Sequence, residues 1–387
     1  YDSKKLIEKM PQVRSVILDE IHYLKGYKAQ RTKVIQKWIR EKSNATHVIG
    51  LSGTPILNKG SEIFTVVNVL HCNVDQNGKV PENVYETVGG GLLTYQEFYG
   101  NGNDKFVYEL HDNPYSPDSV TGYMVKPERQ QELSKLLKDR GIMIRHTKSI
   151  LYALGLLTEL TKEPIVIDEP KGYREKLDEL YSLYGGIKIA QLTKIRQWLA
   201  MAKVPFVIEY VKNITENYQN KVIIFGNYKA PLRALAVEFN TVSHDSDMKT
   251  PERQKLVDEF MIQKKTRVLI MTAMTGGVGL NLTEANHVVF NDYSYSPATM
   301  EQAESRAHRL GQKNNVTIHY ITAENTVDED AVDLLTKKSM VINGIIDGTP
   351  HVYSERGIEQ TIVDKLNKMM KEQRVKKTRT AKFHQKK

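Results

Sequence analysis

Short apolar runs alternate with helical stretches along most of this chain, and this alternation limits its fold more than any other feature. Near the N-terminus the apolar runs cover residues 13–18 and 46–51, with helical composition over 29–40 between them. Runs this short, separated by helices, are typical of strands in a parallel sheet that is covered on both faces. The sequence therefore predicts an α/β fold with parallel sheets.

The same alternation starts again near residue 221, after a less regular middle part. Gly and Pro are frequent over about 73–127, which indicates loops, and helical patterns follow over 128–140 and 172–216. The second α/β part has strand-like runs at 222–225, 268–271, 287–290 and 316–321, and helical patterns at 231–239, 251–262 and 299–310. We therefore expect two α/β lobes joined by a helical and irregular middle.

These patterns give approximate domain limits. Residues 1–150 are expected to form part of a first lobe, with an irregular insertion at about 73–127. Residues 151–345 would hold a helical linker and the second lobe, and residues 346–387 a basic tail.

The net charge of +9 and the pI near 9.2 favour a polyanionic partner, although many basic proteins bind nothing anionic. From Lys365 to Lys387 there are eight lysines and two arginines against one acid, Glu372. This run is typical of a solvated, flexible tail. The sequence leaves open whether it contacts DNA or only keeps the chain soluble.

Several protein classes are excluded. No apolar stretch approaches the roughly 18–20 residues of a membrane span, and no signal-peptide core follows the N-terminus. The single cysteine, Cys72, rules out an internal disulfide framework and a cysteine-based zinc cluster. We therefore expect an intracellular protein that does not bind membranes.

Two acids directly follow the apolar run 13–18, in the segment Asp19-Glu20-Ile21-His22. The carboxyl ends of parallel strands are where open α/β sheets bind ligands. There one carboxylate can hold Mg²⁺, and the next can orient a water molecule for attack on a phosphoryl group. Taken alone, such a pair is as often a solvated strand end.

Two further segments have the composition of turns at strand ends. Ser52-Gly53-Thr54-Pro55 follows the run 46–51, and taken alone it is most simply a turn. Residues 272–282, which include Gly277 and Gly279, follow the run 268–271. Glycine-rich turns expose backbone N–H groups to anions, but this one is no P-loop, because no Gly-Lys-Ser/Thr follows.

The most specific motif is residues 302–312, Gln-Ala-Glu-Ser-Arg-Ala-His-Arg-Leu-Gly-Gln. On a helix over 299–310, Arg306 and Arg309 would share a face. The planar, permanent charge of arginine suits phosphate, and two such residues could act as arginine fingers on ATP. On an arbitrary helix, the same pair is more often two surface arginines.

In this order, the four motifs closely resemble the core of helicase superfamily 2 and, within it, the SWI/SNF-like ATPases. Residues 302–312 are similar to the last motif of that family almost letter for letter. Supporting similarities lie at 143–148, 202–205, 221–225, Arg253-Gln254 and Phe260. The segment 202–205, Ala-Lys-Val-Pro, is most similar to the annealing-helicase (HARP-like) branch.

The resemblance implies two RecA-like lobes that bind ATP and Mg²⁺ between them and duplex DNA across both. In the first lobe, Asp19 would coordinate Mg²⁺ and Glu20 would be the catalytic base. The residues that would couple the state of ATP to DNA are His22, Ser52, Gly53 and Thr54.

In the second lobe, Arg306 and Arg309 would contact the γ-phosphate, with Gln302 beside them. Gly277 and Gly279 would lie near the nucleotide and the DNA backbone. Two weaker candidates for DNA or lobe contacts, which could equally lie on a solvated lobe edge, are His146 and Lys148.

The chain departs from the family pattern in three places. It holds no Gly-x-x-x-x-Gly-Lys-Ser/Thr, the phosphate-binding motif that the family places upstream of Asp19. We therefore expect the chain to start inside the first lobe, as a fragment or after loss of the motif, and this segment alone to be inactive. Residues 293–297 replace a Trp-x-Pro, and 244–246 replace a segment with glycine.

The implied function is an ATP-dependent translocase that moves on double-stranded or branched DNA and binds mainly its phosphates. The main alternative is a non-catalytic DNA-binding scaffold derived from a decayed motor, which the missing phosphate-binding motif favours. A strand-separating RNA helicase shares the core, but the phrase Arg-x-x-Arg-Leu-Gly-Gln is of the duplex-DNA type.

Overall fold

The computed structural model divides the chain into two compact units, residues 1–145 with 337–355 and residues 146–336 with 356–387. The structure describes residues 7, 9–26, 29–53, 55–56, 62–70, 98, 106–110, 122–144, 148–216, 220–273, 280–347 and 358–384. Among these residues, no helix is long and apolar enough to cross a membrane.

The first unit contains a two-stranded parallel sheet of β1 (Ser15–Leu18) and β2 (His47–Gly50), in a register that pairs Leu18 with Gly50. The adjoining helices are η1 (Ile21–Leu24), α2 (Gln30–Glu41) and α3 (Glu62–Val69). A Cβ at Gly50 would lie 2.5 Å from Ile21 Cδ1, so any larger residue there would force the Ile21 side chain to shift. The hydrogen bond of 3.0 Å from the Ile21 N–H to the Leu51 carbonyl oxygen holds η1 against the end of β2.

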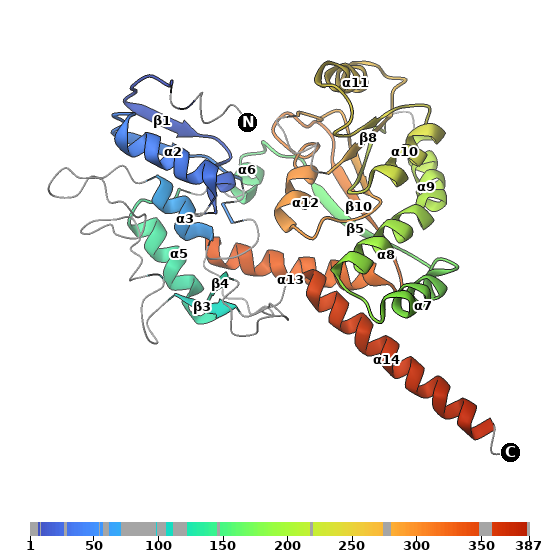
Figure 1. The fold of residues 1–387 in the computed structure, drawn as a ribbon. Coiled ribbons are helices and arrows are strands. Elements are labelled where there is room, and N and C mark those ends of the chain that lie inside the picture. Colours follow the sequence, from blue (N-terminus) through green and yellow to red (C-terminus); the bar gives the residue numbers. More distant parts are fainter. Residues whose placement is uncertain are drawn as a thin grey trace. The chain divides into compact units, whose positions relative to one another are not determined.

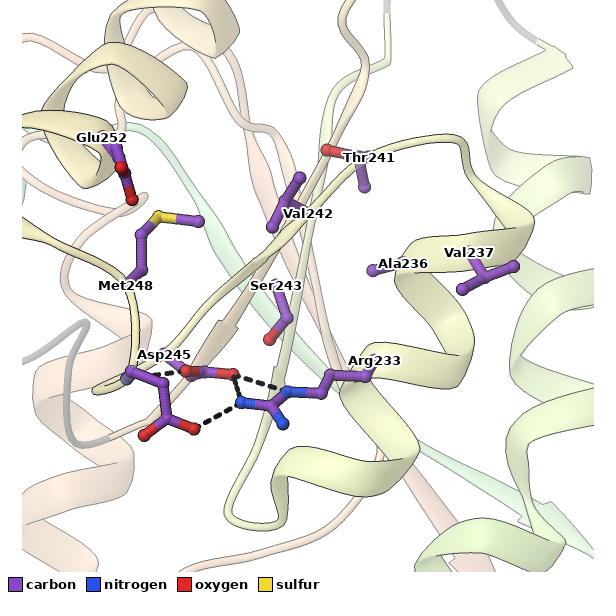
Figure 2. A pocket seen from close by; sticks show the side chains of 10 residues that line it. Arg233, Ala236, Val237, Thr241, Val242, Ser243, Asp245, Met248 and Glu252 are labelled. Carbon is purple, nitrogen blue, oxygen red and sulfur yellow. Dashed lines mark hydrogen bonds and ion pairs between the residues drawn. The ribbon is translucent and has the colours of Figure 1, made fainter.

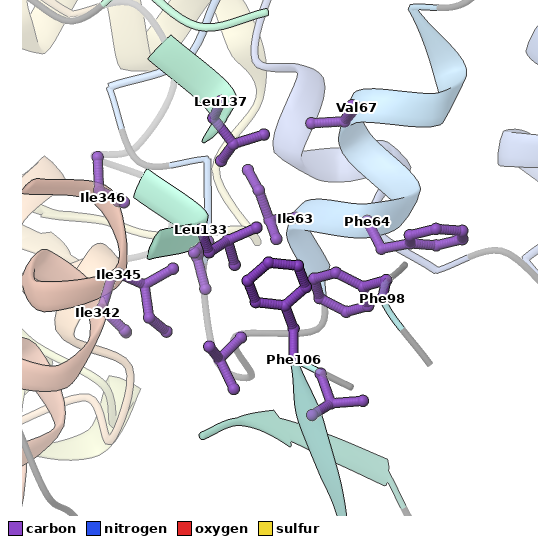
Figure 3. Close-up of a cluster of buried hydrophobic side chains, with 13 residues drawn as sticks. Ile63, Phe64, Val67, Phe98, Phe106, Leu133, Leu137, Ile342, Ile345 and Ile346 are labelled. Atoms are coloured by element: carbon purple, nitrogen blue, oxygen red, sulfur yellow. The ribbon is translucent and has the colours of Figure 1, made fainter. Parts of the chain in front are cut away.

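A second core of the first unit packs helices around an antiparallel hairpin. The elements are β3 (Val107–Leu110), β4 (Gly122–Val125), η2 (Pro127–Arg129) and α5 (Gln130–Asp139). Leu133 and Leu137, four residues apart on α5, are buried beside Phe64 and Phe106 (Figure 3). The segment at about 73–127, predicted to be irregular, lies mostly outside the described residues.

The second unit is built on a six-stranded, entirely parallel sheet in the order β5-β10-β9-β6-β8-β7. Figure 1 labels β5, β8 and β10 of this sheet. The strands are β5 (Leu160–Ile167), β6 (Val222–Gly226), β7 (Ser243–His244), β8 (Val268–Thr272), β9 (His287–Phe290) and β10 (Val316–Ala323). The helices are α6 (Lys148–Ala153), α7 (Tyr173–Tyr184), α8 (Ile189–Ala202), α9 (Val204–Glu216), α10 (Lys229–Glu238), α11 (Thr250–Ile262), α12 (Pro297–Glu304) and α14 (Ile358–His384). Helix α13 (Val327–Asp347) begins in this unit, and its residues from 337 on belong to the first unit. The parallel sheets confirm the predicted α/β fold class.

Burial explains why the central strands are apolar throughout. All residues of β6 are buried, and Ile224 lies in a core with Val289 of β9 and Leu235 of α10. Val207 of α9 belongs to the same core. A strand covered in this way has no polar face, so its run of apolar residues is visible in the sequence.

Three expectations for the second unit were wrong or incomplete. Strand β5 was not predicted, because it lies at the edge of the sheet, where exposed Lys162 and Glu163 and even Pro164 are tolerated. Helix α12 ends at Glu304, and not near residue 310, so Arg306 and Arg309 lie on turns. The predicted flexible tail instead forms α14, whose apolar residues pack against the unit.

A buried histidine on β10 makes the stability of the second unit dependent on pH. His319 is 4% exposed, and its ring lies 3.0 Å from His287 and 3.1 Å from the Tyr210 hydroxyl. Burial, with the neighbouring His287, lowers its pKa from 6.5 to about 4, while Glu163 lies 3.4 Å away. In the unfolded chain the ring takes up a proton at a higher pH than in the folded unit.

We therefore expect the free energy of unfolding to be highest above pH 6.5 and to fall by about 3 kcal/mol between pH 6.5 and pH 4, from this group alone. Urea unfolding at pH 7, 6, 5 and 4 measures this. The His319→Gln variant is the control, and its loss of stability over the range should be smaller by that amount. Parallel pH profiles of the two proteins would contradict the assignment.

Candidate functional site

The two predicted acids lie at the carboxyl end of β1. Asp19 is exposed, and its Oδ1 accepts a hydrogen bond of 2.9 Å from the backbone N–H of Glu20. Glu20 has φ 50° and ψ 47°, the left-handed conformation that a residue with a side chain rarely adopts. Such strained residues cluster at functional sites. This conformation turns the chain from β1 directly into η1.

His22 connects this turn with the segment that follows β2. Its imidazole is 1% exposed, and Nδ1 lies 2.8 Å from Ser52 Oγ and 3.2 Å from Glu20 Oε2. Burial, and then the charge of Lys25, lowers the pKa of His22, so the ring is neutral at pH 7. The structure thus brings Ser52 next to Glu20 and His22, which lie about 30 positions earlier in the sequence.

The surroundings of Asp19 fit a magnesium ion in their donor type. Asp19 offers an exposed carboxylate at a strand end, and Mg²⁺ prefers one or two carboxylates together with water and phosphate oxygens. In the described part of the chain, no group of three or more His, Cys, Asp or Glu side chains could enclose a metal. The residues therefore suit an ion that arrives with a phosphate ligand.

In the second unit, the predicted arginine pair converges on one backbone oxygen. Arg306 Nη1 and Arg309 Nη1 each lie 3.3 Å from the carbonyl oxygen of Leu280 and donate to it. Arg306 is 8% exposed, whereas Arg309 is exposed. Gln302 lies one turn earlier on α12, where its backbone oxygen accepts from Ser305 Oγ at 2.9 Å. The turns after α12 thus bring the two guanidinium groups together, although the predicted helix does not extend to them.

His308, which was not a predicted site residue, fixes these turns. It is 2% exposed, and its Nε2 donates to the Thr158 carbonyl oxygen at 2.8 Å and lies 3.4 Å from the Tyr152 hydroxyl. Burial lowers its pKa, so the ring is neutral at pH 7. Its place between two arginines in the motif gave no signal of this role, because both partners are distant in sequence.

Other predicted residues lie outside this geometry. Lys148 begins α6, and its Nζ lies 3.9 Å from Glu301, a partly exposed pair that contributes little to stability. Gly53 has open space where a Cβ would be, so no packing requires glycine there. Four of the predicted site residues lie outside the described part of the chain: Thr54, His146, Gly277 and Gly279.

An aromatic cluster occupies the segment where the family often has Trp-x-Pro. The guanidinium of Arg196 lies 3.8 Å from the ring centroid of Tyr295 and 5.5 Å from that of Tyr228. Burial raises the pKa of Tyr228 to about 12, so its hydroxyl stays protonated. A stacking contact is therefore present in this segment, made by tyrosine and arginine.

A pocket of 390 Å³ lies beside α10 and β7 (Figure 2). Three of its charged residues are paired with one another, because Arg233 binds both Asp245 and Asp247, and Lys229 also binds Asp247. Asp245 is 2% exposed and accepts the backbone N–H of Asp247 at 2.9 Å. The aspartate that follows His244, in the segment where the family has a glycine, therefore stabilises the turn.

Two known protein-family models match this chain, and together they include residues of both units. A model described as an SNF2-related domain matches residues 2–168, and one described as a helicase conserved C-terminal domain matches residues 202–311. The chain belongs to the SWI/SNF-like family of helicase superfamily 2. This confirms the family predicted from the four motifs.

Relatives of known name belong to the same family. The mouse protein "DNA annealing helicase and endonuclease ZRANB3" is 28% identical over 351 residues, which cover 87% of this chain and 30% of the relative. The Caenorhabditis elegans "SWI/SNF-related matrix-associated actin-dependent regulator of chromatin subfamily A-like protein 1 homolog" is 29% identical over 360 residues, with 88% and 46% covered. The chain thus spans less than half the length of these SWI/SNF-like relatives.

Solved structures of the family are also similar. "Sulfolobus solfataricus SWI2/SNF2 ATPase core in complex with dsDNA" is 17% identical, with a TM-score of 0.40, and the match covers 90% of this chain and 72% of that one.

Proposed function

We propose that this chain is part of an ATP-hydrolysing motor that moves along double-stranded or branched DNA inside the cell. The observation that carries the proposal is the contact series Glu20–His22–Ser52, in which His22 Nδ1 is hydrogen-bonded to Ser52 Oγ and lies 3.2 Å from Glu20 Oε2, so that it links the acidic motif at the end of β1 to the segment after β2. A decayed scaffold has no chemical need for this network. Family membership and the names of its relatives support the same conclusion.

In the first unit, Asp19 would hold Mg²⁺, and Glu20 would orient a water molecule and accept its proton. Magnesium-bound ATP supplies the phosphoryl group whose transfer to that water drives the cycle. His22 is neutral and contacts both Glu20 and Ser52. A movement of the Glu20 side chain would therefore change the position of His22 and, through it, of Ser52. We propose that this contact, with Gly53 and Thr54, couples the state of the nucleotide to DNA.

In the second unit, Arg306 and Arg309 would neutralise charge on the γ-phosphate, with Gln302 beside them. Their shared contact with the Leu280 carbonyl keeps both guanidinium groups at one place. Gly277 and Gly279 are proposed to lie near the phosphates, and His146 and Lys148 are proposed as DNA or lobe contacts. Binding to DNA would go mainly to phosphates, so it should be independent of sequence and sensitive to salt.

The first test is ATP hydrolysis by the full-length natural protein without DNA and with single-stranded, duplex and forked DNA. Glu20→Gln should abolish the DNA-stimulated rate, because the amide cannot accept the proton of the attacking water. The matched control is Glu41→Gln on α2, where only an exposed ion pair of 3.8 Å to Lys37 is lost.

Strong stimulation by duplex or forked DNA that is lost only in Glu20→Gln would support the motor. Salt-sensitive DNA binding without hydrolysis under any condition would favour the scaffold instead. Equal rates for Glu20→Gln and the wild-type protein would remove Glu20 from the proposed mechanism.

A further inference from the structure

The C-terminal helix α14 is held firmly on the second unit by one of its faces. It contacts α8, and its residues Ile362, Leu366 and Met370 are buried. Asn367 forms two hydrogen bonds with the backbone of Ile187, of 2.8 Å to its N–H and 2.7 Å to its oxygen. Arg374, four residues beyond Met370, covers the Tyr181 ring at 4.4 Å.

The opposite face of α14 is exposed and basic. Lys368 and Lys371 are exposed and three residues apart, so they share one side of the helix. Lys365, one turn earlier, is also exposed but is paired with Asp330. The sequence continues this helical spacing with Lys376, Arg379 and Lys382, with no acid after Glu372.

A hollow of 610 Å³ lies between this helix and the loop that joins α7 to α8. Three lysines line it, Lys188 from the loop and Lys368 and Lys371 from α14, together with the acids Asp364 and Glu372. Gly185 and Gly186 have φ of 68° and 152°, a backbone conformation that favours glycine, and they leave the loop without side chains at these two positions. The hydrogen bonds of Asn367 fix the loop to the helix, so the lysines are arranged before any ligand binds.

We propose that the lysine surface, defined as Lys188, Lys368 and Lys371, binds backbone phosphates of double-stranded DNA, separately from the motifs of the motor. This inference rests on the proposed function, because DNA is taken as the polyanion. The exposed lysines from Lys365 to Lys371 span roughly 9 Å of the helix axis, a length over which a duplex presents several phosphates.

The chemistry favours duplex DNA over other polyanionic surfaces. Single-stranded nucleic acid needs exposed aromatic rings for its bases, and α14 has none over residues 358–374. Tyr181, the aromatic ring among the residues that line the hollow, is covered by Arg374. A membrane surface needs a helix with an exposed apolar face, whereas the apolar face of α14 is buried.

The test compares the salt dependence of duplex binding between two triple variants of the full-length protein. The first, Lys188→Gln, Lys368→Gln and Lys371→Gln, removes the lysine surface. The control, Lys255→Gln, Lys264→Gln and Lys265→Gln, removes the same charge from exposed positions on α11 and the loop before β8. Binding constants are measured by fluorescence anisotropy from 50 to 200 mM salt.

Loss of three phosphate contacts should make the slope of log K against log salt less steep by about 2.7, and the control slope should equal the wild-type slope. An unchanged slope in the first variant, or an equal change in both, would overturn the inference. Should the first variant fail to fold, protection of Lys188, Lys368 and Lys371 from acetylation by bound duplex gives the answer in the wild-type protein. If the wild-type protein binds no duplex at all, the proposed function fails, and not only this inference.

Discussion

Replacing Arg309 with alanine is expected to reduce DNA-stimulated ATP turnover by about 10³–10⁵-fold, the range lost when an arginine finger is removed. Arg309 is exposed, and its hydrogen bond to the protein, of 3.3 Å to the Leu280 carbonyl, is a long one. Its removal should therefore cost little folding stability. The loss would fall on the γ-phosphate contact that we propose for this residue.

The measurement is steady-state ATP hydrolysis at saturating duplex DNA, together with duplex binding by anisotropy. Lys313→Ala is the matched control, because Lys313 is an exposed cation four residues further along the chain. Arg309→Lys keeps the charge but loses the planar fork, so it should recover only part of the rate. An Arg309→Ala protein that hydrolyses ATP at the wild-type rate would exclude the finger assignment.

Replacing Lys203 with methionine is expected to lower the free energy of unfolding of the second unit by about 3–5 kcal/mol. The Lys203 side chain is fully buried, and its Nζ donates to Asp328 Oδ2 at 2.6 Å and to the Ile321 carbonyl at 2.9 Å. Methionine fills a similar volume, so the cost comes from the buried carboxylate that remains without its cation.

Urea unfolding compares this variant with the double variant Lys203→Met, Asp328→Leu, which should recover part of the loss because neither charge remains. The control is Lys212→Met, which breaks an exposed pair with Glu238 and should cost at most about 1 kcal/mol. A loss for Lys203→Met as small as that of the control would contradict the structural role of the pair.

The pair also explains a similarity that the sequence could only note. The residues at 202–205, Ala-Lys-Val-Pro, are similar in type to those of the annealing-helicase branch, but the sequence does not show what these residues do. In the structure, Lys203 lies between α8 and α9 and ties them to the end of β10 and to α13 through Ile321 and Asp328. This motif therefore holds helices on the sheet.

The sequence by itself determined the fold class and the family. Strands such as β6 and β9 are buried on both faces, so their apolar runs are unbroken and their positions are visible without a structure. The four motifs were recognised by their order and by their similarity to the family, because each taken alone could as well be a turn, a strand end or a surface pair. The edge strand β5 and the helical state of α14 were missed, because the contacts that hold them come from elsewhere in the chain.

Only the tertiary structure decided how the motif residues are held. His22 meets Ser52 across 30 positions of sequence, and His308 meets the Thr158 carbonyl across 150. Arg306 and Arg309 were expected to share a helical face, whereas a common hydrogen-bond acceptor, the Leu280 carbonyl, brings them together on turns. Local spacing predicts which side chains share a helix or strand, but long-range pairing depends on how the sheet and its loops pack, which no local pattern encodes.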